Sequence, residues 1–391
     1  MAVIQSIACR KVLNSHVKFT HEFILTLENG ASGYGASSQG ETISIYEDKK
    51  VSIDADSIIQ TITRDGLIGA PLDQAAFDAY LQRHIAQFGR NNAFGLSEAF
   101  FNADNQSKTI FESFDRPPAR LTPPHICLNI LNGGWHAYTN PVLSDFSEFM
   151  LVAKSTDLQE VIAEHNEIQR VVNERLLRQT KTVVSGNPVN CFPTADNREP
   201  IDFLLNLCEE LGLDDKYELM IDASAGDLHS DAGYTFAITD QSVRSSEDLS
   251  EYWRDLIQNY GLRWLEDPFH EKDFPAWQRL TTSQQASHVI GDNLYSSNPE
   301  RIAQGAAERY ADAVVIKPNQ AGTVSEVRRA IETAQAHGQI PIASHRSIST
   351  ESTFLSKLTC IYGVPYIKIG PLITDYSSVV RFNEIVRLTE G

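Results

Sequence analysis

The sequence is poor in cysteine and contains no long apolar run. Its five cysteines stand far apart and form no C-x-x-C pair, which argues against structural disulfides and a cysteine-rich metal site and favours a reducing compartment. No segment approaches the roughly 18 consecutive apolar residues of a membrane-spanning helix, and Met1–Leu13 lacks the pattern of a signal peptide. We therefore expect a soluble, cytoplasmic protein that does not enter a membrane.

Basic residues are scarce relative to acidic ones. Lys and Arg total 33 against 51 Asp and Glu, which gives a formal net charge of −18. A surface of this sign repels nucleic acid and anionic membranes, so neither is an expected partner. Most of the surplus carboxylates belong to a solvated surface, but some can gather around a cation.

The 391 residues exceed the size at which a single core keeps growing, so we expect a small domain and a large one. The first part begins with alternating apolar positions at Ala2, continues through a Gly/Ser-rich loop at 30–40 and becomes helical over 72–105, as in an α+β domain. Four prolines in residues 116–124 resist both helix and strand. We therefore place an N-terminal α+β capping domain at 1–116 and a barrel domain at 117–391.

After Pro124, short apolar runs alternate with amphipathic stretches of helical length at 157–180, 199–212 and 325–337. This alternation over about 270 residues predicts an α/β fold with a (β/α)8-type barrel. An open, doubly wound sheet is the alternative, but no G-x-G-x-x-G follows a strand.

Ionisable residues end six of these apolar runs, at intervals of 23 to 44 residues that suit one strand and one helix each. The six residues are Asp222, Glu266, Asp292, Lys317, His345 and Lys368. Taken singly, a carboxylate there can be a helix cap and a histidine can be structural. In a barrel, however, the carboxyl ends of the strands form the active-site mouth, so the recurrence predicts that all six converge on one site.

Three carboxylates without cysteine or paired histidines suit a hard cation, Mg²⁺ before Mn²⁺, and disfavour zinc. Such a cation can hold a substrate carboxylate and stabilise the charge that appears when the adjacent carbon loses its proton. A lysine in a desolvated, cation-rich pocket is a plausible base for that proton.

Seven segments, in order and with fitting spacing, resemble the motifs of the enolase family. They are Asn129–Ala137, Ser147–Met150, Leu265–Phe269, Gly291–Leu294, Ile316–Val324, the single signature formed by Ser344–Ser347 and Thr350–Glu351, and Ile367–Gly370. The resemblance runs through nearly the whole chain. It implies an enolase-type barrel and two Mg²⁺ ions per site, a small anionic phosphorylated substrate such as 2-phosphoglycerate, and a homodimer.

The resemblance also implies roles for individual residues. The first Mg²⁺ would be bound by Asp222, Glu266 and Asp292, Lys317 would remove the α-proton, and Lys368 would contact the substrate carboxylate. The phosphate would be held by Arg346 and Ser347, and the leaving-group side would be lined by His345, His136 and Glu148. Residues 35–40 are similar to the family's G-A-S-T-G loop, so Ser37 or Ser38 would bind the second Mg²⁺.

One part of the family pattern is missing. Where the family carries G-D-E-G-G with its acidic glutamate, this chain has Ser185–Cys191 and no carboxylate before Asp196. The change favours a specialised relative, such as the enzyme that forms carboxyphosphonoenolpyruvate with a nucleotide-activated phosphonate in phosphonate and phosphinate antibiotic pathways. Two alternatives stay open: an ordinary phosphopyruvate hydratase in which Glu148 or His345 takes over the acid role, and a non-catalytic binding protein, against which the retained lysines and carboxylates argue.

Overall fold

A computed structural model describes residues 1–38, 40, 44–47, 53–134, 140–176, 180–184, 187–191, 196–283, 286–372 and 374–390, with 180–184 and 187–191 as backbone alone. In the first part of the chain, an antiparallel sheet packs against a small group of helices. Its strands are β1 (Ala2–Leu13), β2 (Phe19–Leu27), β3 (Ser32–Ala36) and β4 (Pro71–Leu72). Its helices are α1 (Ala55–Arg64), α2 (Gln74–Arg83), α3 (Ile85–Phe88), α4 (Arg90–Asp104) and α5 (Ile110–Ser113). Phe23, Phe77 and Phe100 are fully buried between the two layers.

The Gly/Ser-rich segment is only partly the loop that the sequence predicts. Residues 32–36 form β3, which pairs with β2 from Glu22↔Ala36 to Thr26↔Ser32. Helix α4 lies directly on this strand, because a Cβ at Gly33 or Gly35 would overlap the backbone of Ala99 or Gly95. The glycines therefore serve the close approach of two backbones rather than a turn.

Eight strands form a closed barrel, which confirms the predicted fold class. They are β5 (His125–Asn132), β6 (Glu148–Ala153), β9 (Tyr217–Asp222), β13 (Trp264–Glu266), β14 (His288–Gly291), β15 (Ala313–Ile316), β16 (Ile340–Ser344) and β17 (Tyr366–Lys368). Strand β6 runs antiparallel to both of its neighbours. Its first residue therefore lies at the same edge as the carboxyl ends of the other strands.

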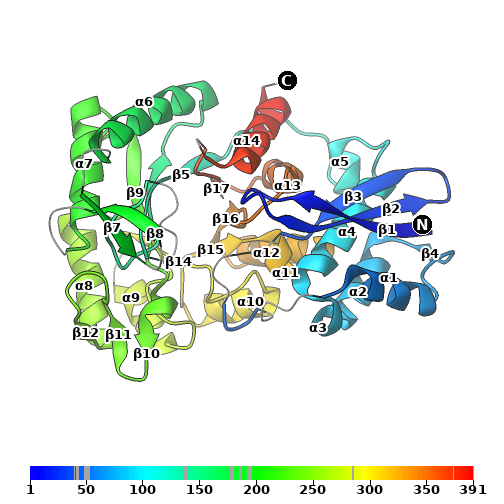
Figure 1. Cartoon of the computed structure of the whole chain (residues 1–391), viewed down its shortest axis with the longest axis horizontal. Coiled ribbons are helices and arrows are strands. Elements are labelled where there is room, and N and C mark those ends of the chain that lie inside the picture. Colours follow the sequence, from blue (N-terminus) through cyan, green and yellow to red (C-terminus); the bar gives the residue numbers. More distant parts are fainter. Residues whose placement is uncertain are drawn as a thin grey trace.

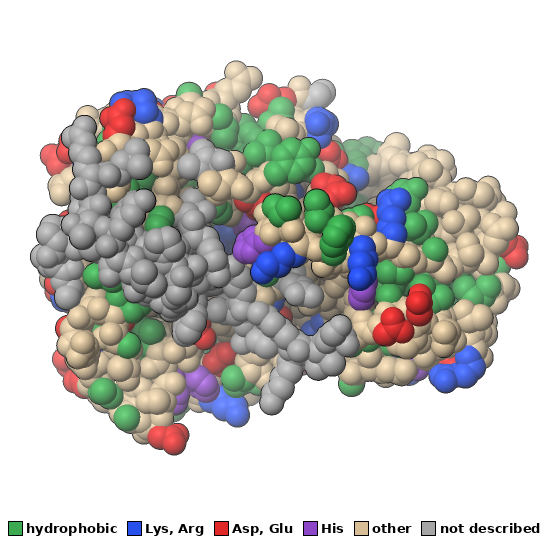
Figure 2. Space-filling model, in the orientation of Figure 1, with side chains coloured by type: hydrophobic (Ala, Val, Ile, Leu, Met, Phe, Trp, Pro, Cys, Tyr) green, Lys and Arg blue, Asp and Glu red, His purple; other side chains and the backbone are tan. Residues whose placement is uncertain are grey.

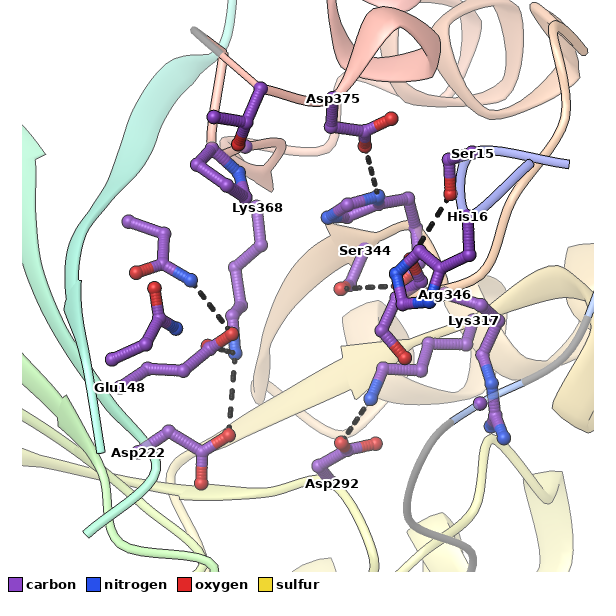
Figure 3. A pocket seen from close by; sticks show the side chains of 18 of the residues that line it. Ser15, His16, Glu148, Asp222, Asp292, Lys317, Ser344, Arg346, Lys368 and Asp375 are labelled. Atoms are coloured by element: carbon purple, nitrogen blue, oxygen red, sulfur yellow. Dashed lines mark hydrogen bonds and ion pairs between the residues drawn. The ribbon is translucent and has the colours of Figure 1, made fainter. Parts of the chain in front are cut away.

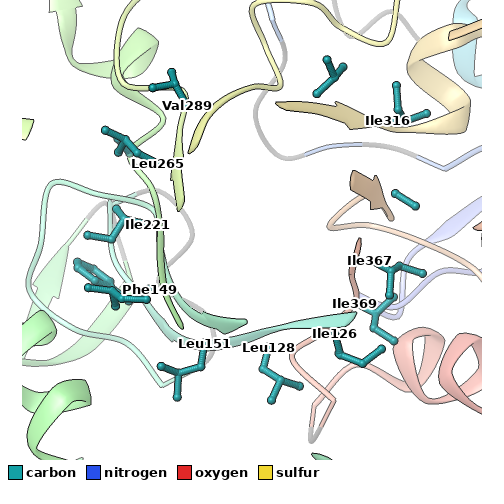
Figure 4. Close-up of a cluster of buried hydrophobic side chains, with 14 of the residues drawn as sticks. Ile126, Leu128, Phe149, Leu151, Ile221, Leu265, Val289, Ile316, Ile367 and Ile369 are labelled. Atoms are coloured by element: carbon teal, nitrogen blue, oxygen red, sulfur yellow. The ribbon is translucent and has the colours of Figure 1, made fainter. Parts of the chain in front are cut away.

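Helices surround the barrel, as Figure 1 shows for α6, α7, α8 and α9 on one side and α12 and α14 on others. They are α6 (Leu158–Leu176), α7 (Glu199–Leu211), α8 (Ser246–Asn259), α9 (Phe274–Ser283), α10 (Pro299–Ala307), α11 (Pro318–Ala321), α12 (Val324–Ala336), α13 (Phe354–Ile361) and α14 (Tyr376–Thr389). Strand residues alternate between the barrel interior and these helices: in β6, Met150 faces the interior cluster while Phe149 and Leu151 join the outer one (Figure 4).

Smaller elements complete the described chain: the hairpin β7 (Thr180–Val184) with β8 (Asn187–Cys191), the short strands β10 (His229–Ser230), β11 (Gly233–Thr235) and β12 (Val243–Arg244), and one turn of 3-10 helix, Ala225–Leu228. Residues 116–124 have no helix or strand and lead from α5 into the barrel. Among the described residues, no helix is long and apolar enough to cross a membrane. On the face in Figure 2, acidic, basic and apolar side chains are interspersed in the coloured part.

Candidate functional site

The predicted strand-end residues converge at one mouth of the barrel. A cavity of about 480 Å³ opens there, and Asp222, Asp292, Lys317, His345 and Lys368 all line it. The sixth residue, Glu266, lies beneath the cavity with no exposed surface and contacts Lys368. Figure 3 shows Glu148, Asp222, Asp292, Lys317 and Lys368 pointing toward one another from the ends of different strands or the residues just after them.

Lys368 is surrounded by carboxylates. Its Nζ donates to Oε1 and Oε2 of Glu266 at 2.9 and 2.7 Å, and it lies 3.2 Å from Oε2 of Glu148 and 3.7 Å from Oδ2 of Asp222. Burial alone would lower the pKa of the Lys368 ammonium, but Glu266, Glu148 and Asp222 raise that pKa well above its ordinary value. Lys368 therefore stays positively charged and offsets part of the negative charge at the floor of the site.

Glu148 owes its place to the antiparallel direction of β6, which pairs it with Asp222 at the barrel mouth. Its Oε1 accepts a hydrogen bond of 2.9 Å from Nδ2 of Asn129 on β5. Both residues line the cavity. The glutamate is thus held between an amide donor and an ammonium group.

Lys317 follows β15 and forms an ion pair with Asp292. Its backbone N–H donates to Oγ of Ser297 at 2.8 Å, and the same hydroxyl donates to Oε1 of Gln320 at 2.9 Å. Burial raises the pKa of the Asp292 carboxyl, but the charge and hydrogen bond of Lys317 outweigh burial and leave that pKa below its ordinary value. Asp292 is therefore an ionised carboxylate that faces the amine of Lys317.

Asp267 fixes the backbone that carries Asp292. Its Oδ1 and Oδ2 accept hydrogen bonds from the backbone N–H groups of Asp292 and Asn293 at 3.0 and 2.8 Å. It is 3% exposed and takes a left-handed backbone conformation, with φ of 42°. These two hydrogen bonds give a physical reason for the acidic residue that follows Glu266 in the segment Leu265–Phe269.

The site carries more negative than positive charge. Four carboxylates, from Glu148, Asp222, Glu266 and Asp292, face the two ammonium groups of Lys317 and Lys368, so the fully ionised set has a charge of −2. Burial, followed by the neighbouring Asp222, raises the pKa of Glu266 well above its ordinary value, as expected of a cluster that lacks positive charge. All four carboxylates offer only oxygen atoms as ligands, so the set fits a hard divalent cation in both charge and ligand type. In the described part of the chain, no group of three or more His, Cys, Asp or Glu side chains is arranged to hold a metal ion, and the Nζ of Lys368 contacts Glu148, Asp222 and Glu266.

His345 lies beside Asp375, with Nδ1 3.7 Å from Oδ2 of the aspartate. Asp375 caps α14, where its carboxylate accepts hydrogen bonds from Ser377 and Ser378. Burial, and after it the charge of Arg381, lowers the pKa of His345 to about 4. His345 is therefore a neutral imidazole at physiological pH.

Arg346 also lines the cavity, as does Ser347, while the two predicted loop serines do not. Ser38 lines a smaller adjoining cavity and accepts a hydrogen bond of 3.1 Å at its carbonyl from Nδ2 of Asn319. Ser37 is 4% exposed, and its carbonyl accepts from Thr20 Oγ1 at 2.6 Å. The remaining predicted residue, His136, lies outside the described residues.

Comparison with known proteins agrees with this geometry. The family model described as the C-terminal TIM barrel domain of enolase matches residues 121–391, more than half of the chain. This chain belongs to the enolase family. It is 29% identical to "Enolase 2" of Methanospirillum hungatei over 409 residues, covering 99% of this chain and 95% of the relative. It is 29% identical to an enolase of Thermoplasma acidophilum over 402 residues (99% and 98%), and 34% identical to an enolase of Legionella pneumophila over 278 residues (68% and 65%). The identities fit a divergent member, and the chain is an enolase-family enzyme.

Several residues of this enolase-family site were not predicted from the sequence. The turn between β1 and β2 contributes Ser15, His16 and Lys18 to the cavity wall. Ser15 N–H donates to the carbonyl of Ser349 at 2.7 Å, which ties the turn to the loop that follows β16. The local sequence around Ser15 does not indicate that this turn lies beside residues more than 300 positions later in the chain.

A buried glutamate beside the site gives a testable pH effect. Glu98 of α4 is 3% exposed and accepts a hydrogen bond from Ser352, and burial raises its pKa from 4.5 to about 7. The folded state therefore holds this proton more tightly than the unfolded state, so the free energy of unfolding falls as the pH rises from about 4.5 to about 7. A rise of the Glu98 pKa from 4.5 to about 7 corresponds to a fall of roughly 3 kcal/mol in the free energy of unfolding, and replacing Glu98 with glutamine should remove this fall.

Urea unfolding at pH 4.5, 6 and 8 measures this difference between the parent and Glu98→Gln. The exposed Glu28 provides a matched control, since Glu28→Gln is expected to follow the parent at every pH. If the Glu98→Gln and parent stabilities change in parallel across this range, the buried carboxyl does not hold its proton as described.

Proposed function

We propose that this chain catalyses the Mg²⁺-dependent removal of the α-proton from 2-phosphoglycerate or a close analogue and forms an enolpyruvate product. One observation carries the proposal: two lysines and three carboxylates line a single cavity in an enolase-type barrel, and the buried Glu266 contacts one of these lysines. The relatives named enolase support the same reaction class. The direct test is the appearance of the conjugated enol product in the far ultraviolet, with 2-phosphoglycerate and Mg²⁺.

In this proposal Lys317 is the base. Its amine lines the cavity beside Asp292, and the side chain is only 17% exposed, so a substrate bound there would meet a base that is shielded from bulk water. Lys368 keeps its charge and would hold the substrate carboxylate as negative charge moves onto it. A first Mg²⁺ held by Asp222, Glu266 and Asp292 would add fixed positive charge at the same carboxylate, and a second one would bind near Ser37 or Ser38.

The phosphate of the substrate would lie against Arg346 and Ser347 at the cavity wall. A guanidinium fork suits this group because it can donate to two oxygens at once. We also propose that residues 1–116 form a capping domain over the barrel and that the enzyme is a homodimer. Sedimentation of the purified protein measures the second point.

The group that protonates the departing hydroxide is proposed to be Glu148. Residues 180–195 contain no Asp or Glu, so the hairpin β7–β8 cannot supply a carboxylic acid. Glu148 lines the cavity, where Asn129 and Lys368 hold its carboxyl group in place. His345 is the weaker candidate because burial keeps its imidazole neutral.

We expect Glu148→Gln to lower the rate of product formation by about 10²-fold while exchange of the C2 proton with solvent continues. The reason is that glutamine keeps the hydrogen bond to Asn129 but has no proton of suitable acidity to give. Deuterium incorporation into 2-phosphoglycerate, followed by NMR, separates the two steps. The exposed Glu174 gives a control in Glu174→Gln, and an equal loss of exchange and product formation in Glu148→Gln would assign Glu148 to an earlier step.

A specialised version of this function has one observation in its favour, the absence of any acidic residue from the hairpin. In that version the enzyme is a carboxyphosphonoenolpyruvate synthase of phosphonate or phosphinate antibiotic biosynthesis and uses a nucleotide-activated phosphonate as co-substrate. It predicts that 2-phosphoglycerate binds without turnover until such a phosphonate is added. Rapid turnover of 2-phosphoglycerate alone would instead support the ordinary phosphopyruvate hydratase.

A further inference from the structure

The guanidinium of Arg346 already has an anionic partner within the chain. Its Nη1 lies 2.9 Å from Oε2 of Glu47, and the two side chains are only 4% and 8% exposed. Arg346 follows β16 of the barrel, whereas Glu47 comes from the N-terminal part of the chain, some 300 residues earlier. The pair is therefore a long-range, desolvated contact and not an exposed surface pair.

Glu47 is held in place by several further contacts. Its Oε1 accepts hydrogen bonds of 3.2 Å from Nε2 of Gln320 and from the backbone N–H of Ser44. Ser44 Oγ in turn donates to the carbonyl of Asn293 at 2.8 Å. Residues 44–47 are thus attached directly to the loops that carry Asp292 and Lys317.

The rest of the guanidinium is closely covered. A Cβ at Gly40 would collide with Nη2, Cζ and Nε of Arg346, so the backbone at residue 40 lies directly against the group. The Nε atom is buried and has no hydrogen-bond acceptor among the described residues. Arg346 nonetheless lines the main cavity, so a ligand there meets an arginine whose charge is already balanced.

We propose that Glu47 is a specificity-determining residue that competes for Arg346 with the doubly charged group of the substrate. This inference rests on the proposed function, which gives Arg346 to the phosphate. If Glu47 stays, a phosphate dianion approaches a buried carboxylate of the same sign, which costs free energy in a poorly solvated site. If Glu47 leaves, a buried and hydrogen-bonded ion pair must first be broken. On either route the carboxylate weakens the affinity of the cavity for a dianion and favours ligands of lower charge.

Calorimetric titration of the full chain with inorganic phosphate and with 2-phosphoglycerate, at pH 7.5 and fixed Mg²⁺, tests the proposal. We expect Glu47→Gln to bind both ligands at least about tenfold more tightly than the parent, because glutamine keeps the hydrogen bonds of Glu47 and removes its charge. Glu47→Asp keeps the charge and should not bind more tightly. Glu271 is a matched control: it is also buried and accepts from the backbone N–H of Ile45 at 3.3 Å, so Glu271→Gln removes a charge beside the same segment without removing the partner of Arg346.

Thermal unfolding gives a second readout, should Glu47→Gln be less stable because Arg346 has lost its partner. Phosphate should then raise the unfolding temperature of Glu47→Gln more than that of the parent, since the anion replaces the missing charge. Unchanged or weaker phosphate binding by a folded Glu47→Gln protein would overturn the proposal, as would equal tightening in Glu271→Gln. These are binding measurements, so they are separate from the proposed reaction, which is judged by turnover of 2-phosphoglycerate.

Discussion

Replacing Lys317 with alanine is expected to lower the turnover of 2-phosphoglycerate by about 10²- to 10⁴-fold, the range typical of a lost general base. Lys317 lines the cavity and has Asp292 as its ion-pair partner, so its amine is held on the side of the carboxylate cluster. The substitution should also abolish exchange of the C2 proton with solvent deuterium, measured by NMR. Loss of both turnover and C2-proton exchange would identify proton abstraction as the affected step. Loss of turnover with exchange retained would place the defect in a later step.

Two controls accompany this variant. Lys154 is an exposed lysine whose Nζ donates to the carbonyl of Asp215 at 2.9 Å, and Lys154→Ala should keep the parental rate. Because Asp292 loses its ammonium partner in Lys317→Ala, Mg²⁺ binding and urea unfolding must be measured on the same preparation. A folded Lys317→Ala protein that still exchanges the C2 proton would show that another group is the base.

The barrel and its mouth could be predicted because both depend on local patterns. Each strand is a short apolar run, and the residue that ends it projects toward the mouth whichever helix follows. In the structure Asp222, Glu266 and Lys368 end their strands, and Asp292, Lys317 and His345 each follow a strand by one residue. The place of Glu148 was harder to foresee, because it depends on β6 running against its neighbours, and a single strand pattern does not reveal its direction.

The parts that escaped prediction are set by distant contacts. Glu47 meets Arg346, Asp375 meets His345, and Ser15 meets Ser349, each across a gap in the sequence that no periodicity spans. The prediction of a loop around Gly33 and Gly35 was partly wrong. Glycine-rich segments are typical of loops, but here both glycines belong to strand β3, where they allow close packing against α4. Local patterns thus predicted which charged residues form the floor of the site, whereas the residues of its walls can be identified only in the folded structure.

The floor itself gives the largest expected effect on stability. Glu266 has no exposed surface, and Lys368 donates to both of its oxygens. Lys368→Met keeps the length of the side chain but leaves buried carboxylates without a cation, so in the presence of a chelator the free energy of unfolding should fall by about 3–5 kcal/mol. The loss should be smaller at pH 5 than at pH 8, because the raised pKa of Glu266 allows it to take up a proton and become neutral.

Added Mg²⁺ should recover part of this loss if the same carboxylates form a cation site, since a divalent ion would then replace the missing ammonium. Urea unfolding with chelator and with Mg²⁺, for parent and variant, measures both effects. Lys357 is the matched control: it is 37% exposed and 3.9 Å from Glu384, so Lys357→Met should change stability by no more than about 0.5 kcal/mol and show no dependence on Mg²⁺. If Mg²⁺ does not stabilise Lys368→Met, the four carboxylates serve only as ionic partners of this lysine. If Mg²⁺ restores stability, the carboxylates form a cation site whose negative charge Lys368 balances in the metal-free state.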